Sequence, residues 1–173
     1  LPPARVGRRA ARRDTSRVDA LARVANPADV IEMRALLEPQ FARLAAVRAS
    51  ALESARIVRA ATSRPGEEYG AADLAFHREI AQASRNALAA EFYQLLREVG
   101  TDSRVRLAPA RPLCPRRLEE RDAEHMAIAR AISDRDPDRA EAAMRAHLST
   151  VQRLILQRLS PEVPAAQSAA TAR

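Results

Sequence analysis

Between residues 30 and 47, apolar side chains recur about every 3.6 positions, the repeat of an α-helix that buries one face. The stripe consists of Val30, Met33, Leu36, Leu37, Phe41, Leu44 and Val47. Asn26 and Pro27 precede it, and an asparagine N-cap followed by proline in the first turn is a typical helix start. Pro39 lies inside the stripe and is expected to kink the helix.

Further helices are expected over residues 50–62, 70–84, 87–107, 116–133 and 137–159. Breaks rich in proline, glycine or aspartate separate them, at residues 63–66, 108–115 and 134–137. Alanine, leucine, arginine and glutamate favour helices, the chain has only four glycines, and no segment alternates as a strand would. The sequence therefore predicts an all-α antiparallel bundle of about six helices.

The net charge of +7 is concentrated at one end, because residues 1–25 contain seven arginines and two aspartates. These residues contain no aromatic side chain for stacking on bases, so we interpret them as a basic arm or interdomain linker that could contact phosphates incidentally. Residues 26–160 form the expected domain, and residues 161–173 a flexible tail. The single cysteine, Cys114, excludes an internal disulfide. No apolar run reaches the roughly 18 residues of a membrane span, so we expect a cytoplasmic protein.

Three histidines and one aspartate can be placed by helix geometry. Asp73 and His77 are four residues apart, so their side chains lie on one face of a helix. His125 lies roughly ten residues before the turn near Asp136 and His147 roughly eleven after it, so an antiparallel hairpin brings both to a level about 16 Å from the turn. Each histidine lies in the apolar stripe of its helix. All four side chains are therefore expected to meet inside the bundle.

Burying these four polar groups without partners would cost several kcal/mol, and a divalent metal ion removes that cost. A single histidine on an apolar face is more often a hydrogen-bonded core residue, but the joint placement favours a metal site. Imidazole and carboxylate suit zinc, nickel, manganese and iron. We expect zinc, with the other three ions as alternatives.

The sequence resembles the FCD domain, the C-terminal effector-binding domain of the FadR subgroup of GntR-type bacterial transcription regulators. The resemblance covers about residues 27–159. The segments that support it are Ile31–Pro39, Asp73–His77 with Ala83–Asn86, Glu124–Ile132 with Asp136–Pro137, and Ala142–Leu148. It implies the metal-binding subtype, with Asp73, His77, His125 and His147 as ligands.

The resemblance further implies a homodimeric sensor that binds a small organic acid and modulates DNA binding by a winged helix-turn-helix domain. Because too few residues precede Asn26 to form that domain, we expect it to be absent from this chain. The expected protein is not an enzyme. A metal-dependent hydrolase or oxygenase is the main alternative, but no extra base is evident, since Glu124 is expected to point to a different face from His125. A structural helical interaction module is the second alternative.

Four residues are candidates for effector contacts. Arg34 leans toward the core and could bind a carboxylate, or it could form a surface ion pair with Glu38 one turn later. Asn86 could donate to the effector or cap the helix that follows. Arg97 and Arg104 are further candidates, with exposure to solvent as their alternative.

Overall fold

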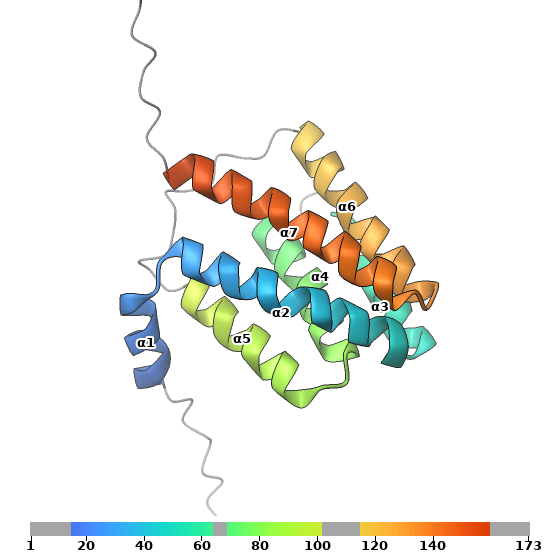
Figure 1. The fold of residues 1–173 in the computed structure, drawn as a ribbon, viewed down its shortest axis with the longest axis horizontal. Helices are drawn as coiled ribbons and strands as arrows, with labels where there is room; N and C mark the ends of the chain where they lie inside the picture. Colours follow the sequence, from blue (N-terminus) through green and yellow to red (C-terminus); the bar gives the residue numbers. More distant parts are fainter. Residues whose placement is uncertain (1–14, 64–68, 102–114, 160–173) are drawn as a thin grey trace, which may run out of the picture.

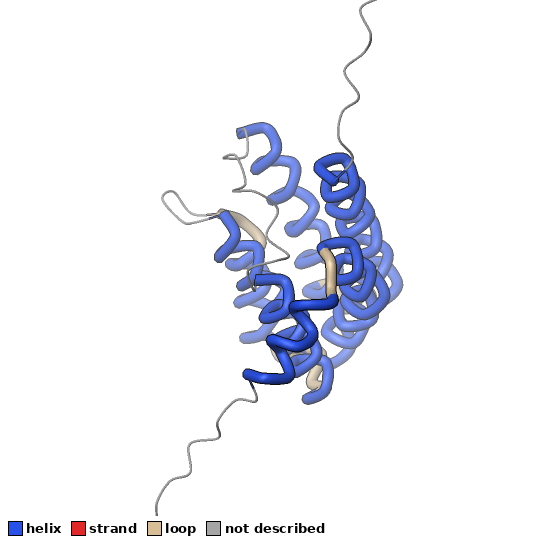
Figure 2. Tube along the Cα trace, turned by 90° about the vertical axis from the view of Figure 1, so that its left-hand side faces the viewer, coloured by secondary structure: helices blue, strands red, loops and turns tan. Residues whose placement is uncertain are grey.

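The computed structural model describes residues 15–63, 69–101 and 115–159. Within these ranges the chain forms helices joined by short loops and contains no strand (Figure 2). The helices are α1 (Thr15–Val24), α2 (Pro27–Arg48), α3 (Ala51–Ala60), α4 (Tyr69–Ala83), α5 (Ala87–Thr101), α6 (Pro115–Ser133) and α7 (Pro137–Leu159). The all-α prediction is confirmed. The additional helix is α1, which lies in the segment interpreted as an arm, while the expected tail and most of the expected loop at 108–115 lie outside the described residues.

The predicted helix starts are confirmed by their capping bonds. The side-chain oxygen of Asn26 accepts from the backbone N–H groups of Ala28 at 2.8 Å and Asp29 at 3.0 Å, and the Asp29 carboxylate accepts from Asn26 N at 2.8 Å. Asp136 begins α7 in the same manner, accepting from Arg139 N at 3.0 Å. These bonds satisfy backbone donors that have no partner within the helix. α2 continues as one helix through Pro39.

The buried face of α2 differs from the predicted stripe. Leu36 and Val47 are exposed by 64% and 62%, and Met33 is also exposed. The face that packs inward keeps Phe41 of that stripe and adds Ile31, Glu38, Ala42, Ala45 and Ala46, and Ala49 is buried directly after the helix. Because the side chain of alanine is small, the backbones of two helices can approach closely at these positions.

α2 lies along α7, and this pair forms the most extensive contact between helices in the described part of the chain (Figure 1). α6 and α7 form an antiparallel hairpin, and α4 packs against α2, α3 and α5. The hairpin turn contains Arg135 with φ of 60°, and Asp136 N donates to Ala131 O at 3.0 Å, the bonding pattern of a Schellman motif. α1 packs against α5. As a result, α2, α4, α6 and α7 enclose a shared interior.

No helix in the described part of the chain is long and apolar enough to cross a bilayer.

Candidate metal centre

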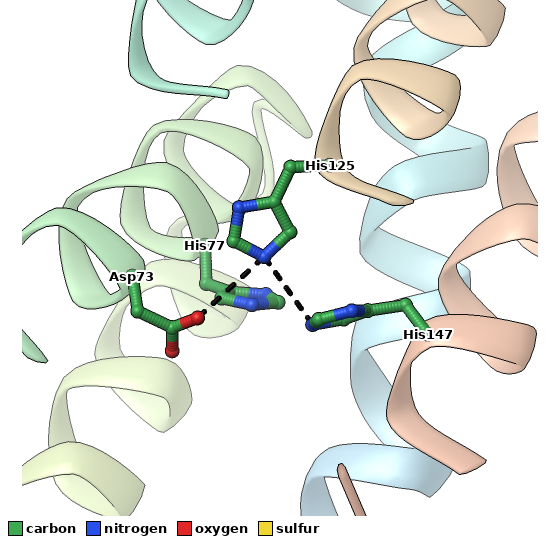
Figure 3. A group of neighbouring side chains, drawn as sticks. All are labelled: Asp73, His77, His125 and His147. Atoms are coloured by element: carbon green, nitrogen blue, oxygen red, sulfur yellow. Dashed lines mark hydrogen bonds and ion pairs between the residues drawn. The ribbon is translucent and has the colours of Figure 1, made fainter. Parts of the chain in front are cut away.

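Three helices bring the four predicted ligands together (Figure 3). Asp73 and His77 come from α4, His125 from α6 and His147 from α7. Each residue offers one ligand atom, and these atoms all lie within 4.8 Å of one another. The three histidines are buried, whereas the Asp73 side chain is 21% exposed. The cluster therefore has an enclosed side of imidazoles and one acidic ligand that reaches solvent.

The His125 ring lies at the centre of this group. Its Nε2 is 3.3 Å from Nε2 of His147 and 3.5 Å from Oδ1 of Asp73. Phe76 stacks on one face of the ring, with centroids 4.1 Å apart and an angle of 14° between the planes. Because the aromatic face restricts rotation of the imidazole, Nε2 stays directed at the other ligands.

Burial favours the neutral form of two histidines in the cluster, His125 and His147. Burial lowers the pKa of His125 far below its usual value, and any charge on His77 and His147 would lower it further. Burial also lowers the pKa of His147, by more than the neighbouring Glu124 carboxylate raises it. Neutral imidazole is the form that binds metal ions.

Two glutamates contact the ring nitrogens on the far side of the cluster. Oε2 of Glu38, in α2, lies 2.6 Å from Nδ1 of His77. Oε2 of Glu124, in α6, lies 2.8 Å from Nδ1 of His147. The Glu38 contact is short, although the ring N–H is not well aligned with the carboxylate oxygen. Glu38 also accepts from Nε of Arg34 at 2.5 Å.

The charge state of Glu38 follows from these contacts. Burial raises its pKa, but the positive charge of Arg34 and the contact with His77 outweigh burial and bring the pKa to about 2. Arg34 stays protonated for the same reason. Burial lowers its pKa, and the Glu38 and Asp73 carboxylates more than reverse that effect.

The cluster passes a simple test of fitness for a metal ion. Nε2 of His77 is buried and has no hydrogen-bond partner among the described residues. A buried imidazole nitrogen without a partner is costly, and a divalent cation among three imidazoles and a carboxylate would satisfy it. The donor set, three nitrogens and one oxygen, suits zinc and other first-row divalent ions.

The predicted effector residues lie in different surroundings. Arg34 forms the ion pair with Glu38 that was its alternative, but the pair is buried and Nη2 of Arg34 has no hydrogen-bond partner in the described part of the chain. Asn86 is exposed and its side-chain oxygen accepts from Leu88 N at 3.1 Å, which caps α5. Arg97 is half-buried on α5, and Arg104 lies outside the described residues.

Sequence reasoning missed Glu38 and Glu124 as neighbours of the histidines. A signal existed for Glu38, because it follows Ile31 by seven residues on the face that proves to be buried. Glu124 was expected to point to a different face from His125, which left no evident base beside the ligands, but its carboxylate contacts the proposed ligand His147. What the sequence did not indicate is that the adjacent face of α6 meets α7, so that Glu124 reaches His147.

Comparisons with known proteins agree on one family. Residues 29–150 match the FCD domain family. The chain is 32% identical over 130 residues to the "Putative L-lactate dehydrogenase operon regulatory protein" of Escherichia coli, covering 71% of this chain and 49% of that protein. It is 31% identical over 135 residues to the "Glc operon transcriptional activator" of the same species, covering 72% and 53%. The chain thus spans about half the length of these relatives.

A solved structure has a similar fold. A GntR protein from Streptococcus agalactiae superposes with a TM-score of 0.55 at 22% identity, covering 79% of this chain and 60% of that one.

Proposed function

The chain belongs to the FCD domain family of GntR-type transcription regulators, and from this premise we propose that it is a sensor domain that holds a divalent metal ion and a small carboxylate effector. The proposed ligands of the ion are Asp73, His77, His125 and His147. The observation that supports them best is the convergence of four ligand atoms within 4.8 Å, one of them a buried nitrogen without a partner.

The proposed effector binds on the open side of the cluster. A bound divalent ion would supply a positive charge with free coordination positions, to which a carboxylate oxygen can bind. Arg34 is the proposed second anchor, because it is permanently charged and its buried Nη2 has no partner among the described residues. Asp73, at the solvent-exposed edge of the cluster, marks the side from which an acid can enter. Asn86 and Arg97 stay lesser candidates.

The proposed readout is a change in DNA affinity. An effector that binds between α2, α4, α6 and α7 would favour one arrangement of these helices, and α1 would pass the change to a winged helix-turn-helix domain. We also propose that the protein is a homodimer and acts in the cytoplasm. Relatives named as operon regulators support this role over the enzyme alternative.

The first experiment is a metal titration. We expect the 173-residue chain, stripped with chelator and titrated with Zn²⁺ in a calorimeter, to bind about one ion per chain. The double variant His125→Ala/His147→Ala removes ligands from two helices and is expected to abolish binding. Arg130→Ala/Arg153→Ala is the matched control, because both arginines are exposed on the same two helices.

The same titration separates the alternatives. Absence of binding by Zn²⁺, Ni²⁺, Mn²⁺ and Fe²⁺ to the unaltered chain would favour a structural helical module. If metal binds, a titration of the loaded chain with L-lactate tests the effector, chosen because a relative is named for an L-lactate dehydrogenase operon. Binding of lactate that Arg34→Met leaves unchanged would contradict the proposed anchor.

A further inference from the structure

The cluster has a second layer of side chains that are not proposed ligands. Glu38 and Glu124 come from α2 and α6, and each contacts the Nδ1 atom of one histidine, at 2.6 Å and 2.8 Å. The two contacts lie on the outer edges of the His77 and His147 rings. Two of the three imidazoles therefore have a carboxylate behind them.

A carboxylate behind an imidazole determines which ring nitrogen carries the hydrogen. An ionised carboxylate can only accept a hydrogen bond, so the nitrogen that it contacts must be the donor. In a neutral imidazole the other nitrogen is then left with a free lone pair. For His147 that nitrogen is Nε2, which lies 3.3 Å from Nε2 of His125 inside the cluster. For His77 it is the buried Nε2, which has no hydrogen-bond partner in the described residues. Nδ1 of His77 lies 2.6 Å from Glu38, although its alignment falls short of a hydrogen bond.

The two glutamates are held in different ways. Glu38 is 3% exposed, and Arg34 holds its second oxygen at 2.5 Å, so the carboxylate, the guanidinium and the His77 ring form one connected row. Glu124 is 34% exposed and reaches from α6 to α7. It precedes His125 in the sequence, so one pair of adjacent residues provides a proposed ligand and the support for another.

The side chains around the cluster also include several carboxylates. Asp73, Glu38 and Glu124 are three carboxylates, and Arg34 is the cation that pairs with one of them. A divalent cation held among the histidines would be attracted by these carboxylates. Carboxylates that contact ligand histidines also increase the basicity of the ring and orient it.

We propose that Glu38 and Glu124 are positioning residues that hold His77 and His147 with Nε2 directed at the metal site, and that the pair sets the affinity for the divalent ion. This inference rests on the proposed function. It assigns the selection of the ligand nitrogen to residues that do not themselves bind the ion.

The test is a Zn²⁺ titration of the whole chain in competition with a chromophoric chelator. Glu124→Ala and Glu38→Ala are expected to weaken Zn²⁺ binding by about 10–100-fold each. Glu124→Gln and Glu38→Gln keep an oxygen that can accept and are expected to fall between the alanine variants and the unaltered chain. Glu119→Ala on α6 and Glu32→Ala on α2 are exposed matched controls and should bind as the unaltered chain does.

A second readout separates positioning from a structural role. Long-range ¹H–¹⁵N spectra of the Zn²⁺-loaded chain report which ring nitrogen of each histidine carries hydrogen. We expect hydrogen on Nδ1 of both His77 and His147. Glu124→Ala should shift the His147 signals and leave those of His77 in place, and this comparison remains available if Glu38→Ala fails to fold.

The outcomes are distinguishable. If the unaltered chain binds no Zn²⁺, the proposed function and this inference fail together. If it binds Zn²⁺ and the glutamate variants bind equally tightly, or if hydrogen resides on Nε2 of His77 and His147, the metal site stands and the positioning role is overturned.

Discussion

A buried ion pair between Arg34 and Glu38 lies directly behind His77. Their side chains are 16% and 3% exposed, so neither charge is well solvated. Removing one partner of a buried pair is more costly than removing both, because a lone charge stays in the interior. The pair therefore makes the inner face of α2 sensitive to single substitutions that change its charge.

For this reason Arg34→Met is expected to lower the free energy of unfolding by about 3 kcal/mol. The double variant Arg34→Met/Glu38→Met should recover much of that loss, because no charge is left unpaired. Urea unfolding followed by circular dichroism measures both values. Arg130→Met on the exposed face of α6 is the control. A loss below about 0.5 kcal/mol for Arg34→Met would show that His77 alone is enough to accommodate Glu38.

At the scale of the helices, capping boxes stabilise the starts of α2 and α3, each of which follows a short connection. Only Ala49 and Ser50 separate α2 from α3. The Ser50 hydroxyl accepts from Glu53 N at 3.2 Å, and the Glu53 carboxylate accepts from Ser50 N at 2.6 Å. The reciprocal bonds satisfy two backbone donors at the start of α3.

Ser50→Ala is therefore expected to lower the free energy of unfolding by about 1 kcal/mol. Ser149→Ala is the matched control, because Ser149 is exposed within α7 and donates to Arg145 O in its own helix. That control should be neutral or slightly stabilising, since alanine has the higher helix propensity. Thermal or urea unfolding of the two variants side by side gives the comparison, and equal effects would contradict the capping role.

Local chemistry explains which elements could be predicted from the sequence. Pro27 and Pro137 each follow a capping residue, and such starts depend only on neighbours in the chain. α1 was not expected, because the charge of its segment outweighed the helical spacing of Val18, Leu21 and Ala22. The predicted buried face of α2 was wrong in part, because Met33, Leu36 and Val47 are exposed and several of the buried residues are alanines. Which face of a helix is buried depends on the helices that pack against it, and the sequence of the helix alone does not specify them.

The same distinction applies to the candidate site. The levels of His125 and His147 depend on helix rise and turn position, so arithmetic along the chain places them together. The contacts of Glu38 and Glu124 depend on how α2 and α6 are rotated against α4 and α7. That rotation follows from packing of the whole core. The proposed ligands could therefore be found from the sequence, whereas their supporting carboxylates needed the structure.

At the scale of the whole molecule, the cluster joins helices that are distant in the sequence. α4 contributes Asp73 and His77, and the α6–α7 hairpin contributes His125 and His147. A bound ion would thus connect the middle of the chain to its last hairpin. Binding to the folded state alone stabilises it by an amount that depends on the ratio of free ligand to dissociation constant.

At a free Zn²⁺ concentration of about 100 times the dissociation constant, the stabilisation is expected to be about 2.7 kcal/mol. For a chain of this size that corresponds to a rise in Tm of roughly 5–11 °C. Scanning calorimetry with and without Zn²⁺ measures the rise, and EDTA should reverse it. His125→Ala should remove the response to Zn²⁺, whereas Arg130→Ala should retain it.

Hydrogen exchange of the Zn²⁺-loaded chain locates the stabilisation, with slower exchange expected in α4, α6 and α7 than in α3, which provides no ligand. A uniform slowing across all helices would mean that the ion acts on global unfolding alone, and an unchanged Tm would contradict a bond between α4 and the hairpin.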